Sequence, residues 1–393
     1  MYRRHLAKTL QYVSTKFPVV CVTGPRQSGK TTLVKQVFQE KVYVTLEDMD
    51  TREFAAQDPR GFLNTYPDGL IIDEVQYVPE LLSYMQTRVD ESQLCGQYII
   101  TGSQHLLLSE KVSQSLAGRV ALCELLPCSS SEIDFSEQGS CWDLVWQGLY
   151  PMVHARQIDP SIYYKSYVNT YIERDLRQIT LVKDLAKFRM FLQLCAGRVG
   201  QMINYASLGA DCGIDQKTLR AWLSILEESY IIFLLRPYHE NFNKRLVKSP
   251  KLYFYDTGLA SYLLGIDSPQ DAKLHFARGA LFENFVALEL IKARLNQGKQ
   301  AHIYFWRESN GHEVDFLLEQ SSVLIPIEVK SAATMHESLT KELRFWQNMS
   351  QTPHGYIVYD GHLLQRRGTF DVLPWRHLPE ICAYRPPRQS ESH

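Results

Sequence analysis

The sequence contains no apolar run that approaches the roughly 20 residues a helix needs to cross a bilayer. One apolar run, from Tyr230 to Leu235, has only the length of a buried strand. Residues 1–8 lack an apolar core of the length found in signal peptides. These absences predict a protein that has no membrane partner.

Closely spaced cysteines are also missing. The eight cysteines are scattered, no two of them are separated by only two residues, and the twelve histidines form no cluster with metal-ligand spacing. The sequence therefore indicates neither a zinc site nor a disulfide framework. This cysteine usage favours the reducing cytoplasm as the location of the protein.

An excess of charge of one sign is absent as well. The 42 Lys and Arg residues and the 43 Asp and Glu residues give a net charge of −1, so any surface that attracts nucleic acid must be local. A hydrophobic content of 45% and a charged content of 22% describe a soluble globular protein. With 393 residues, two to three domains are expected.

The sequence does contain a phosphate-binding loop pattern in residues 24–31, which read Gly, any four residues, then Gly-Lys-Thr. The loop lies between the β-branched run 19–23 and a helix-forming run, which disfavours a chance match in a turn. Lys30 would place its charge on the β- and γ-phosphates of ATP, and the Thr31 hydroxyl would bind Mg²⁺. The expected nucleotide-binding residues are Gly24, Pro25, Arg26, Gln27, Ser28, Gly29, Lys30, Thr31 and Thr32.

Strand-like and helical runs alternate from residue 1 to about 127, which predicts a parallel sheet with helices on both faces. Two carboxylates follow the third strand-like run, 70–72. Asp73 is expected to hold the Mg²⁺ shell, and Glu74 to polarise the attacking water. A solvated strand end is the alternative. The position of the pair, one extra strand beyond Thr31, favours the catalytic interpretation.

Two further residues of this region are candidates for contact with the γ-phosphate. Ser103, with Thr101 behind it, ends the fourth strand-like run, although a helix N-cap explains Ser103 about as well. Arg119 precedes the fifth run and would stabilise transition-state charge in its own subunit or in a neighbouring one. A surface arginine is the alternative for Arg119, and Arg26 is ambiguous in the same way.

Residues 24–32, 70–76, 100–103 and 115–126 resemble the AAA-type ATPase domain of a large, mostly uncharacterised prokaryotic family. In that family a restriction-endonuclease-like domain follows the ATPase. The resemblance covers essentially the whole chain, and residues 244–259 are similar to the family's most recognisable block. It implies a sheet order with an additional strand and with both carboxylates next to the phosphate loop.

Residues 201–255 show the pattern of a winged helix-turn-helix. A short helix at 205–212 and a second helix capped by Asp215 precede a strand at 231–235. Two interpretations stay open, DNA contact and a protein–protein module. The second helix would offer Gln216, Lys217 and Arg220 to a DNA groove, and the wing would offer Lys244, Arg245, Lys248 and Lys251 to phosphates.

Carboxylates near the carboxyl end have the spacing of a nuclease. A helix, three strands, a helix and a fourth strand are expected between residues 282 and 359. Asp315 and Glu328 would bind Mg²⁺ on neighbouring antiparallel strands, Glu283 would add a ligand from the helix, and Lys330 would orient or deprotonate the attacking water. The alternatives are a surface strand with alternating charge and a retained fold that no longer cuts.

We therefore expect an α/β protein with a P-loop sheet, a winged-helix region and a restriction-endonuclease-like domain. The predicted segments are the ATPase domain, 1–127; a polar linker and helical connector, 128–200; the winged-helix-like domain, 201–265; and the endonuclease-like domain, 266–393. The favoured function is an ATP- and Mg²⁺-dependent ATPase coupled to DNA. A nucleotide-switched interaction module with a non-cleaving scaffold and a transcription regulator are the alternatives. A homo-oligomer and a monomer are equally consistent with the sequence.

Overall fold

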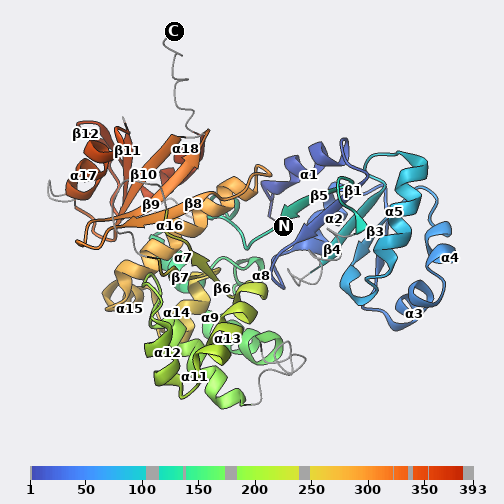
Figure 1. The fold of residues 1–393 in the computed structure, drawn as a ribbon, viewed down its shortest axis with the longest axis horizontal. Coiled ribbons are helices and arrows are strands. Elements are labelled where there is room, and N and C mark those ends of the chain that lie inside the picture. The colour runs from blue at the N-terminus through green and yellow to red at the C-terminus, as the bar shows by residue number, and fades with distance from the viewer. Residues whose placement is uncertain are drawn as a thin grey trace, which may run out of the picture.

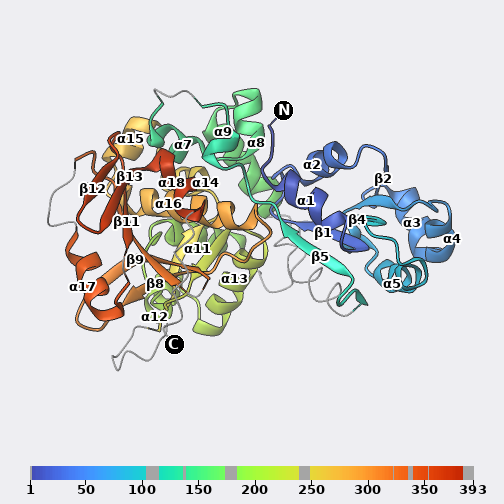
Figure 2. The ribbon, with the colours of Figure 1, turned by 90° about the horizontal axis from the view of Figure 1, so that it is seen from above.

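The computed structural model describes residues 2–102, 115–135, 139–172, 184–238, 248–321, 323–334, 340–352 and 354–383. Within these residues, an amino-terminal α/β domain lies to one side of a larger body formed by the rest of the chain (Figures 1 and 2). The larger body contains a helical region, coloured green to yellow, and a second sheet, coloured orange to red. In the described part of the chain, no helix has the length and apolar character needed to span a membrane.

The first domain is built on a parallel sheet, as its alternating pattern predicts. Its strands are β1 (Val19–Thr23), β2 (Val42–Thr45), β3 (Leu70–Asp73), β4 (Tyr98–Gly102) and β5 (Val120–Glu124). Their order is β2-β3-β4-β1-β5, and all neighbours are parallel. β4 thus separates β1 from β3, which is the order with an additional strand that the family resemblance implies.

Helices cover both faces of this sheet. They are α1 (Leu6–Ser14), α2 (Lys30–Val37), α3 (Met49–Gln57), α4 (Pro59–Asn64) and α5 (Leu81–Ser92), with a 3₁₀ turn, η1 (Val75–Tyr77), after β3. Because successive side chains of a strand point to opposite faces, β1 contributes to two cores. Val20 and Val22 pack with α1 and α2, whereas Val19 and Cys21 pack with α4 and α5.

A helical region follows. Its elements are η2 (Ser130–Glu132), α7 (Cys141–Gln147), α8 (Pro151–Arg156), α9 (Pro160–Tyr167), the π-helical turn η3 (Val168–Ile172), α11 (Leu185–Ala196), α12 (Tyr205–Cys212), α13 (Gln216–Glu228), β6 (Ile232–Leu235), β7 (Lys251–Phe254), α14 (Thr257–Leu263) and α15 (Pro269–Leu274). The prediction of a polar linker at its start is wrong for Cys128, Ser129 and Glu132, which are buried.

The elements expected between residues 201 and 255 are present. Asp215 caps α13 by accepting hydrogen bonds from the backbone of Lys217 and Thr218, and β6 pairs with β7 in antiparallel fashion. Residues 239–247, which include Lys244 and Arg245, lie outside the described residues.

The second sheet is mixed. Its elements are α16 (Arg278–Leu295), β8 (Ile303–Arg307), β9 (Glu313–Gln320), β10 (Val323–Lys330), α17 (Lys341–Ser350), β11 (Gly355–Tyr359), β12 (Gln365–Arg367), β13 (Phe370–Pro374), the 3₁₀ turn η5 (Trp375–His377) and α18 (Leu378–Ala383). The strand order is β12-β13-β11-β10-β9-β8. The order α16-β8-β9-β10-α17-β11 agrees with the expected helix-strand pattern, whereas β12 and β13 were not predicted.

The helical region and the second sheet share one hydrophobic core. Buried side chains from Leu126 to Cys382 form a single contiguous cluster, which includes Phe254 of β7 and Phe285 of α16. These two parts of the chain are therefore packed together as one body and support each other's folding.

Candidate functional site

The phosphate loop connects the buried strand β1 to α2. Gly24 has a φ of 143°, and a Cβ at this position would lie 2.1 Å from the carbonyl oxygen of Leu125. Gly29 precedes α2 with a φ of 94°, in the left-handed region that favours glycine. The two glycines at the fixed positions of the pattern are thus required by close packing and by backbone conformation, respectively.

Lys30 begins α2 and is buried. Its Nζ donates hydrogen bonds to the carbonyl oxygens of Gly24, at 2.9 Å, and Pro25, at 2.8 Å. Burial lowers the pKa of Lys30 to about 8, although the carboxylates of Glu74 and Asp73 act in the opposite direction. A negatively charged ligand beside the ammonium would offset this cost of burial.

Asp73 ends β3 and receives hydrogen bonds from three hydroxyl groups. Its Oδ2 accepts from Thr31 at 2.9 Å and from Tyr43 at 2.7 Å, and its Oδ1 accepts from Thr101 of β4. Because β4 lies beside β3, the parallel sheet brings Thr101 to this carboxylate. The structure therefore brings together Thr31 and Asp73, the two residues predicted to hold Mg²⁺.

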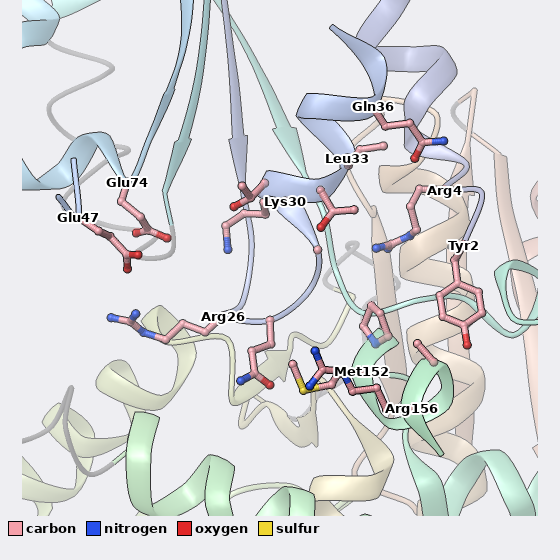
Figure 3. A pocket seen from close by; sticks show the side chains of 16 residues that line it. Tyr2, Arg4, Arg26, Lys30, Leu33, Gln36, Glu47, Glu74, Met152 and Arg156 are labelled. Carbon is pink, nitrogen blue, oxygen red and sulfur yellow. The ribbon is translucent and has the colours of Figure 1, made fainter. Parts of the chain in front are cut away.

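Glu74 has left-handed backbone geometry, with a φ of 57°. This conformation is uncommon for a residue other than glycine and concentrates at functional sites. The backbone N–H of Glu74 donates to Thr101 Oγ1 at 3.3 Å, and its carboxylate accepts from the Gln76 amide. Figure 3 shows the Glu74 side chain on the same side of a cavity as Lys30.

This cavity has a volume of about 490 Å³ and is lined by residues of both the phosphate loop and the helical region. Arg26, Lys30 and Glu74 line it from the first domain, whereas Met152 and Arg156 line it from α8 (Figure 3). The α8 residues were not among those predicted from the sequence. They carry no local motif, and only the packing of the helical region brings them to the loop.

Arg4 also lines the cavity and was missed. Its guanidinium donates to the carbonyl oxygen of Ser28 at 2.7 Å and to that of Leu126 at 2.6 Å, and its Nε pairs with Glu132 at 3.1 Å. The Arg4 side chain is 7% exposed and that of Glu132 is fully buried. An arginine near the start of the chain gives no sequence signal for this role, because its partners are distant in the sequence.

The helical region contacts the ends of β1 and β5 as well. The hydroxyl of Tyr163 donates to Gln27 Oε1 at 2.6 Å, and that of Tyr230 donates to Thr23 Oγ1 at 3.3 Å. Burial raises the pKa of Glu124, the last residue of β5, to about 7, and a hydrogen bond with Tyr230 opposes that rise. The contact between the two bodies thus includes a carboxyl group that titrates near neutral pH.

The phosphate loop contains a buried hydroxyl group that fits an anionic ligand. Ser28 Oγ is buried and has no hydrogen-bond partner among the described residues. Buried polar atoms without partners are rare and costly, so an available donor within a glycine-containing loop at a helix N-terminus fits a phosphate oxygen. Together with the Asp73–Thr31 pair, these residues fit a nucleotide and its magnesium ion.

Comparison with known proteins shows the family of the chain. Residues 16–134 match the family model of an AAA domain. The chain is 32% identical to the uncharacterized protein Rv2008c of Mycobacterium tuberculosis over 363 residues, which are 91% of this chain and 80% of that protein. The chain belongs to this family of AAA-domain proteins. A more distant relative, the uncharacterized protein MJ1544 of Methanocaldococcus jannaschii, is 20% identical over 337 residues, which are 76% of this chain and 71% of that protein.

The remainder of the AAA-domain protein matches two domains of unknown function. Residues 138–270 match DUF8612, and residues 278–378 match DUF4143. Among solved structures, the Walker-type ATPase of Pyrococcus abyssi is similar with a TM-score of 0.44 and 15% identity, over 66% of this chain and 95% of that one.

Two predicted residues of the AAA domain are not part of the described site. Ser103 lies outside the described residues. Arg119 precedes Val120, which pairs with Val19 at the amino end of β1, whereas the phosphate loop follows the carboxyl end of that strand. Its guanidinium pairs instead with the exposed Asp90. The prediction that Arg119 acts on ATP in its own subunit is therefore wrong, because the length of the sheet separates the two.

The second predicted constellation is only partly assembled. Lys330 Nζ lies 2.5 Å from Glu328 Oε1 and 3.9 Å from Asp315 Oδ2, and the backbone N–H of Val329 donates to Asp315 at 2.8 Å. Burial, followed by the nearby charge of Asp315, raises the pKa of Glu328 well above its ordinary value. Glu328 Oε2 is buried and has no partner among the described residues.

Glu283 does not complete a metal site. Its Oε1 accepts from Lys251 Nζ at 2.8 Å and from the Tyr253 hydroxyl at 2.5 Å, and Lys251 also pairs with Glu313 at 2.6 Å. The prediction that Lys251 is a wing cation for DNA phosphates is wrong, because its side chain is only 4% exposed. Across the described ranges, no group of three or more His, Cys, Asp or Glu side chains is placed to hold a metal ion.

Proposed function

We propose that this AAA-domain protein binds ATP together with Mg²⁺ and hydrolyses the nucleotide. The observation that carries the proposal is the meeting of Lys30, Thr31, Asp73 and Glu74 at the carboxyl edge of one parallel sheet, beside a cavity of about 490 Å³. Ligands of α/β proteins bind at this edge. The glycines of the loop and the start of α2 would hold the phosphates, and Thr31 with Asp73 would hold Mg²⁺, which neutralises phosphate charge.

Each of these residues would have a separate role in binding and hydrolysis. The Lys30 ammonium, which bonds to the carbonyl oxygens of Gly24 and Pro25, would exchange these partners for phosphate oxygens. Glu74 would accept a proton from the attacking water, because its carboxylate faces the same cavity. Thr101 forms hydrogen bonds with both Asp73 and the backbone of Glu74, and would hold the two acids in a fixed position relative to each other.

Lys30→Ala tests nucleotide binding. We expect calorimetry to show loss of ATP binding, since the charge that faces the phosphates is gone, while circular dichroism shows an intact fold. Lys35→Ala, at an exposed position of the same helix, is the matched control and is expected to bind normally. Hydrolysis at the wild-type rate by Lys30→Ala would show that the assignment is wrong.

Glu74→Gln tests the chemical step separately. The amide cannot take a proton from water, so we expect ATP binding within about twofold of wild type and kcat lowered by roughly 10²- to 10⁴-fold. Glu47→Gln is the control, because Glu47 lines the same cavity and is exposed. Undiminished turnover by Glu74→Gln would remove this residue from the mechanism.

We further propose that the state of the nucleotide is transmitted to the second body, which serves as an interaction scaffold. Arg4 joins the loop carbonyl of Ser28 to the buried Glu132. Two residues earlier in the same segment, Ser130 donates to Glu289 of α16 from its backbone at 2.9 Å and from its hydroxyl at 2.6 Å. These contacts link the phosphate loop to the longest helix of the second body.

A metal-dependent nuclease is the alternative for the carboxyl-terminal region. The order α16-β8-β9-β10-α17-β11 and the proximity of Asp315, Glu328 and Lys330 support it. Plasmid, linear duplex and single-stranded DNA, each with Mg²⁺ or Mn²⁺, separate the alternatives. Cleavage that disappears in Asp315→Ala and Lys330→Ala favours a nuclease, whereas intact ATPase activity without cleavage favours the scaffold.

DNA contact through a winged helix is a separate proposal. The order α12-α13-β6-β7 supports it, and Gln216, Lys217 and Arg220 are exposed on α13. The Arg220 guanidinium, however, lies 4.0 Å from the centre of the Tyr205 ring, a stacking contact within the protein. DNA binding that weakens with salt, and that Lys217→Ala reduces, would support this role.

Arg119 retains one proposed role, contact with the ATP of a neighbouring subunit. This role requires at least a dimer and release of the pairing with Asp90. Light scattering with and without ATP measures the oligomeric state. Full ATPase activity in a monomer would exclude the role.

A further inference from the structure

Four carboxylates gather between α16, β9 and β10, and we refer to Glu283, Glu313, Asp315 and Glu328 as the acidic cluster. Electrostatic interaction with Asp315 and Glu283 contributes to the raised pKa of Glu328, and Glu313 and Glu283 share the same cationic partner. Neighbouring carboxylates that are both ionised repel one another. Their proximity therefore requires either bound protons or a cation between them.

The structure supplies that cation from another element. Lys251 begins β7, which belongs to the hairpin of the preceding helical region. Its Nζ lies 2.8 Å from Glu283 Oε1 and 2.6 Å from Glu313 Oε1, and the residue is 3% exposed. A single buried ammonium thus bridges α16 and β9.

The charge of this ammonium is maintained by the cluster. Burial by itself lowers the pKa of Lys251, but the charges of Glu283, Asp315 and Glu313 outweigh burial and raise the pKa above its ordinary value. A buried lysine without such partners tends to lose its proton. The two ion pairs with Glu283 and Glu313 therefore favour the charged form of Lys251.

The arrangement does not suit a divalent metal. Mg²⁺ requires oxygen ligands at about 2.0–2.1 Å in octahedral geometry. Glu283, Glu313 and Asp315 already accept hydrogen bonds from protein donors, and Glu328, whose Oε2 has no partner among the described residues, pairs with Lys330 through Oε1. Glu283 Oε1 accepts from Lys251 and Tyr253, and Glu313 Oε2 accepts from Arg307 at 2.9 Å. Asp315 Oδ2 accepts from the backbone of Val329. At Glu283 and Glu313 these bonds fit an ammonium group, and a metal ion there would have to displace Lys251, Tyr253 or Arg307.

We propose that Lys251 is the resident cation of the acidic cluster, that it takes the place of a divalent metal there, and that it fastens β7 to α16 and β9. In this state the endonuclease-like arrangement of Asp315, Glu328 and Lys330 holds no metal ion. The proposal is independent of the ATPase assignment, because its residues belong to the second body.

Mn²⁺ binding to the full-length protein tests the first part. Paramagnetic resonance of free Mn²⁺ is measured in a nucleotide-free titration of the wild type and of Asp315→Asn. We expect identical titrations, because any binding elsewhere is common to both proteins. A wild-type site with a dissociation constant below about 1 mM that Asp315→Asn abolishes would overturn the proposal, and this comparison needs no variant of Lys251.

Lys251→Met tests the second part. The substitution keeps much of the side-chain volume and removes the charge, so Glu283 loses the ammonium group and Glu313 keeps only its pairing with Arg307. We expect this variant to gain about one Mn²⁺ per chain, and the gain to disappear when Asp315→Asn is added. We also expect Mn²⁺ to raise its Tm, since binding to the folded state stabilises it.

Two controls make the result specific. Lys248→Met removes an exposed lysine just before the same strand, and is expected to change neither Mn²⁺ binding nor Tm. Lys251→Arg keeps a cation and is expected to gain no Mn²⁺. If folded Lys251→Met gains no Mn²⁺, or if its Tm equals that of Lys248→Met, then Lys251 is not the cation that holds the cluster together.

Discussion

At the scale of single residues, the nucleotide site depends on one hydroxyl group of β4. Thr101 is fully buried, and its Oγ1 donates to Asp73 while it accepts from the backbone N–H of Glu74. It therefore fixes the orientation of both acids at once. Ser103, the first candidate from the sequence, lies outside the described residues, whereas Thr101, placed behind it, contacts the two acids.

Replacement of Thr101 by valine keeps the shape of the side chain and removes its hydroxyl. A buried acceptor and a buried donor then lose their partner, so we expect Asp73 and Glu74 to become less well positioned for catalysis. The predicted result is a kcat lowered roughly tenfold, equivalent to about 1.4 kcal/mol, with little change in the dissociation constant of ATP. Steady-state kinetics and calorimetry measure the two quantities. Thr101→Ser retains the hydroxyl. If Thr101→Ser is as slow as Thr101→Val, this explanation is contradicted.

At the scale of elements, the sequence was sufficient where a local pattern controls the geometry. The two glycines of the loop are required by the turn between β1 and α2, Lys30 is the first residue of that helix, and Asp73 ends a buried strand. A parallel sheet necessarily brings the carboxyl ends of its strands to one edge, so the Thr31–Asp73 pair followed from strand order.

The sequence was not sufficient where partners come from distant segments. Arg4 meets Glu132, and Lys251 meets Glu283 and Glu313, only through the packing of separate elements. No spacing rule marks such pairs. For the same reason the sequence predicted a metal at Glu283, since it showed the carboxylates but could not show that a lysine from another hairpin lies among them.

The segment before α1 is the element with the clearest predicted effect on the loop. Arg4→Met removes the donor to the Ser28 carbonyl and leaves the carboxylate of Glu132 buried without its cation. We expect a loss of roughly 3–5 kcal/mol in stability, because a buried charge is left unpaired. We also expect weaker ATP binding, because the loop loses its support. Thermal unfolding and calorimetry measure these changes.

A second variant separates the two effects. Adding Glu132→Gln to Arg4→Met removes the unpaired charge, so part of the lost Tm should return. The affinity for ATP should stay low, because the bond to the Ser28 carbonyl remains absent. If affinity recovers together with Tm, Arg4 supports the fold and does not position the loop.

At the scale of the whole molecule, the described structure consists of an ATPase-like domain held against a body with its own continuous core. The contacts between them converge on the site: Met152 and Arg156 line the cavity, and Tyr163 bonds to Gln27 of the loop. We therefore expect a change at the phosphates to reach the second body through these contacts. This arrangement explains why we favour a nucleotide-controlled scaffold over an ATPase that acts alone.

The same interface makes the stability of the molecule depend on pH. Burial raises the pKa of Glu124 from 4.5 to about 7, so between these values the folded protein keeps a proton that the unfolded chain has released. The free energy of unfolding must therefore fall as pH rises through this window and stay lower above it. The contribution of this residue is at most about 3 kcal/mol. Glu124→Gln is neutral at every pH and still offers a polar partner to Tyr230.

We expect Glu124→Gln to have a higher Tm than the wild type at pH 8 and a nearly equal Tm at pH 5, where Glu124 is protonated in the folded protein. Calorimetric scans at both pH values measure the difference. Glu40→Gln, at an exposed position of the first domain, is the control for loss of a carboxylate. If the Tm of Glu124→Gln and the Tm of the wild type fall by the same amount between pH 5 and pH 8, the pH dependence arises from other residues. The negative charge of Glu124 then does not weaken the contact of Tyr230 with β1 and β5.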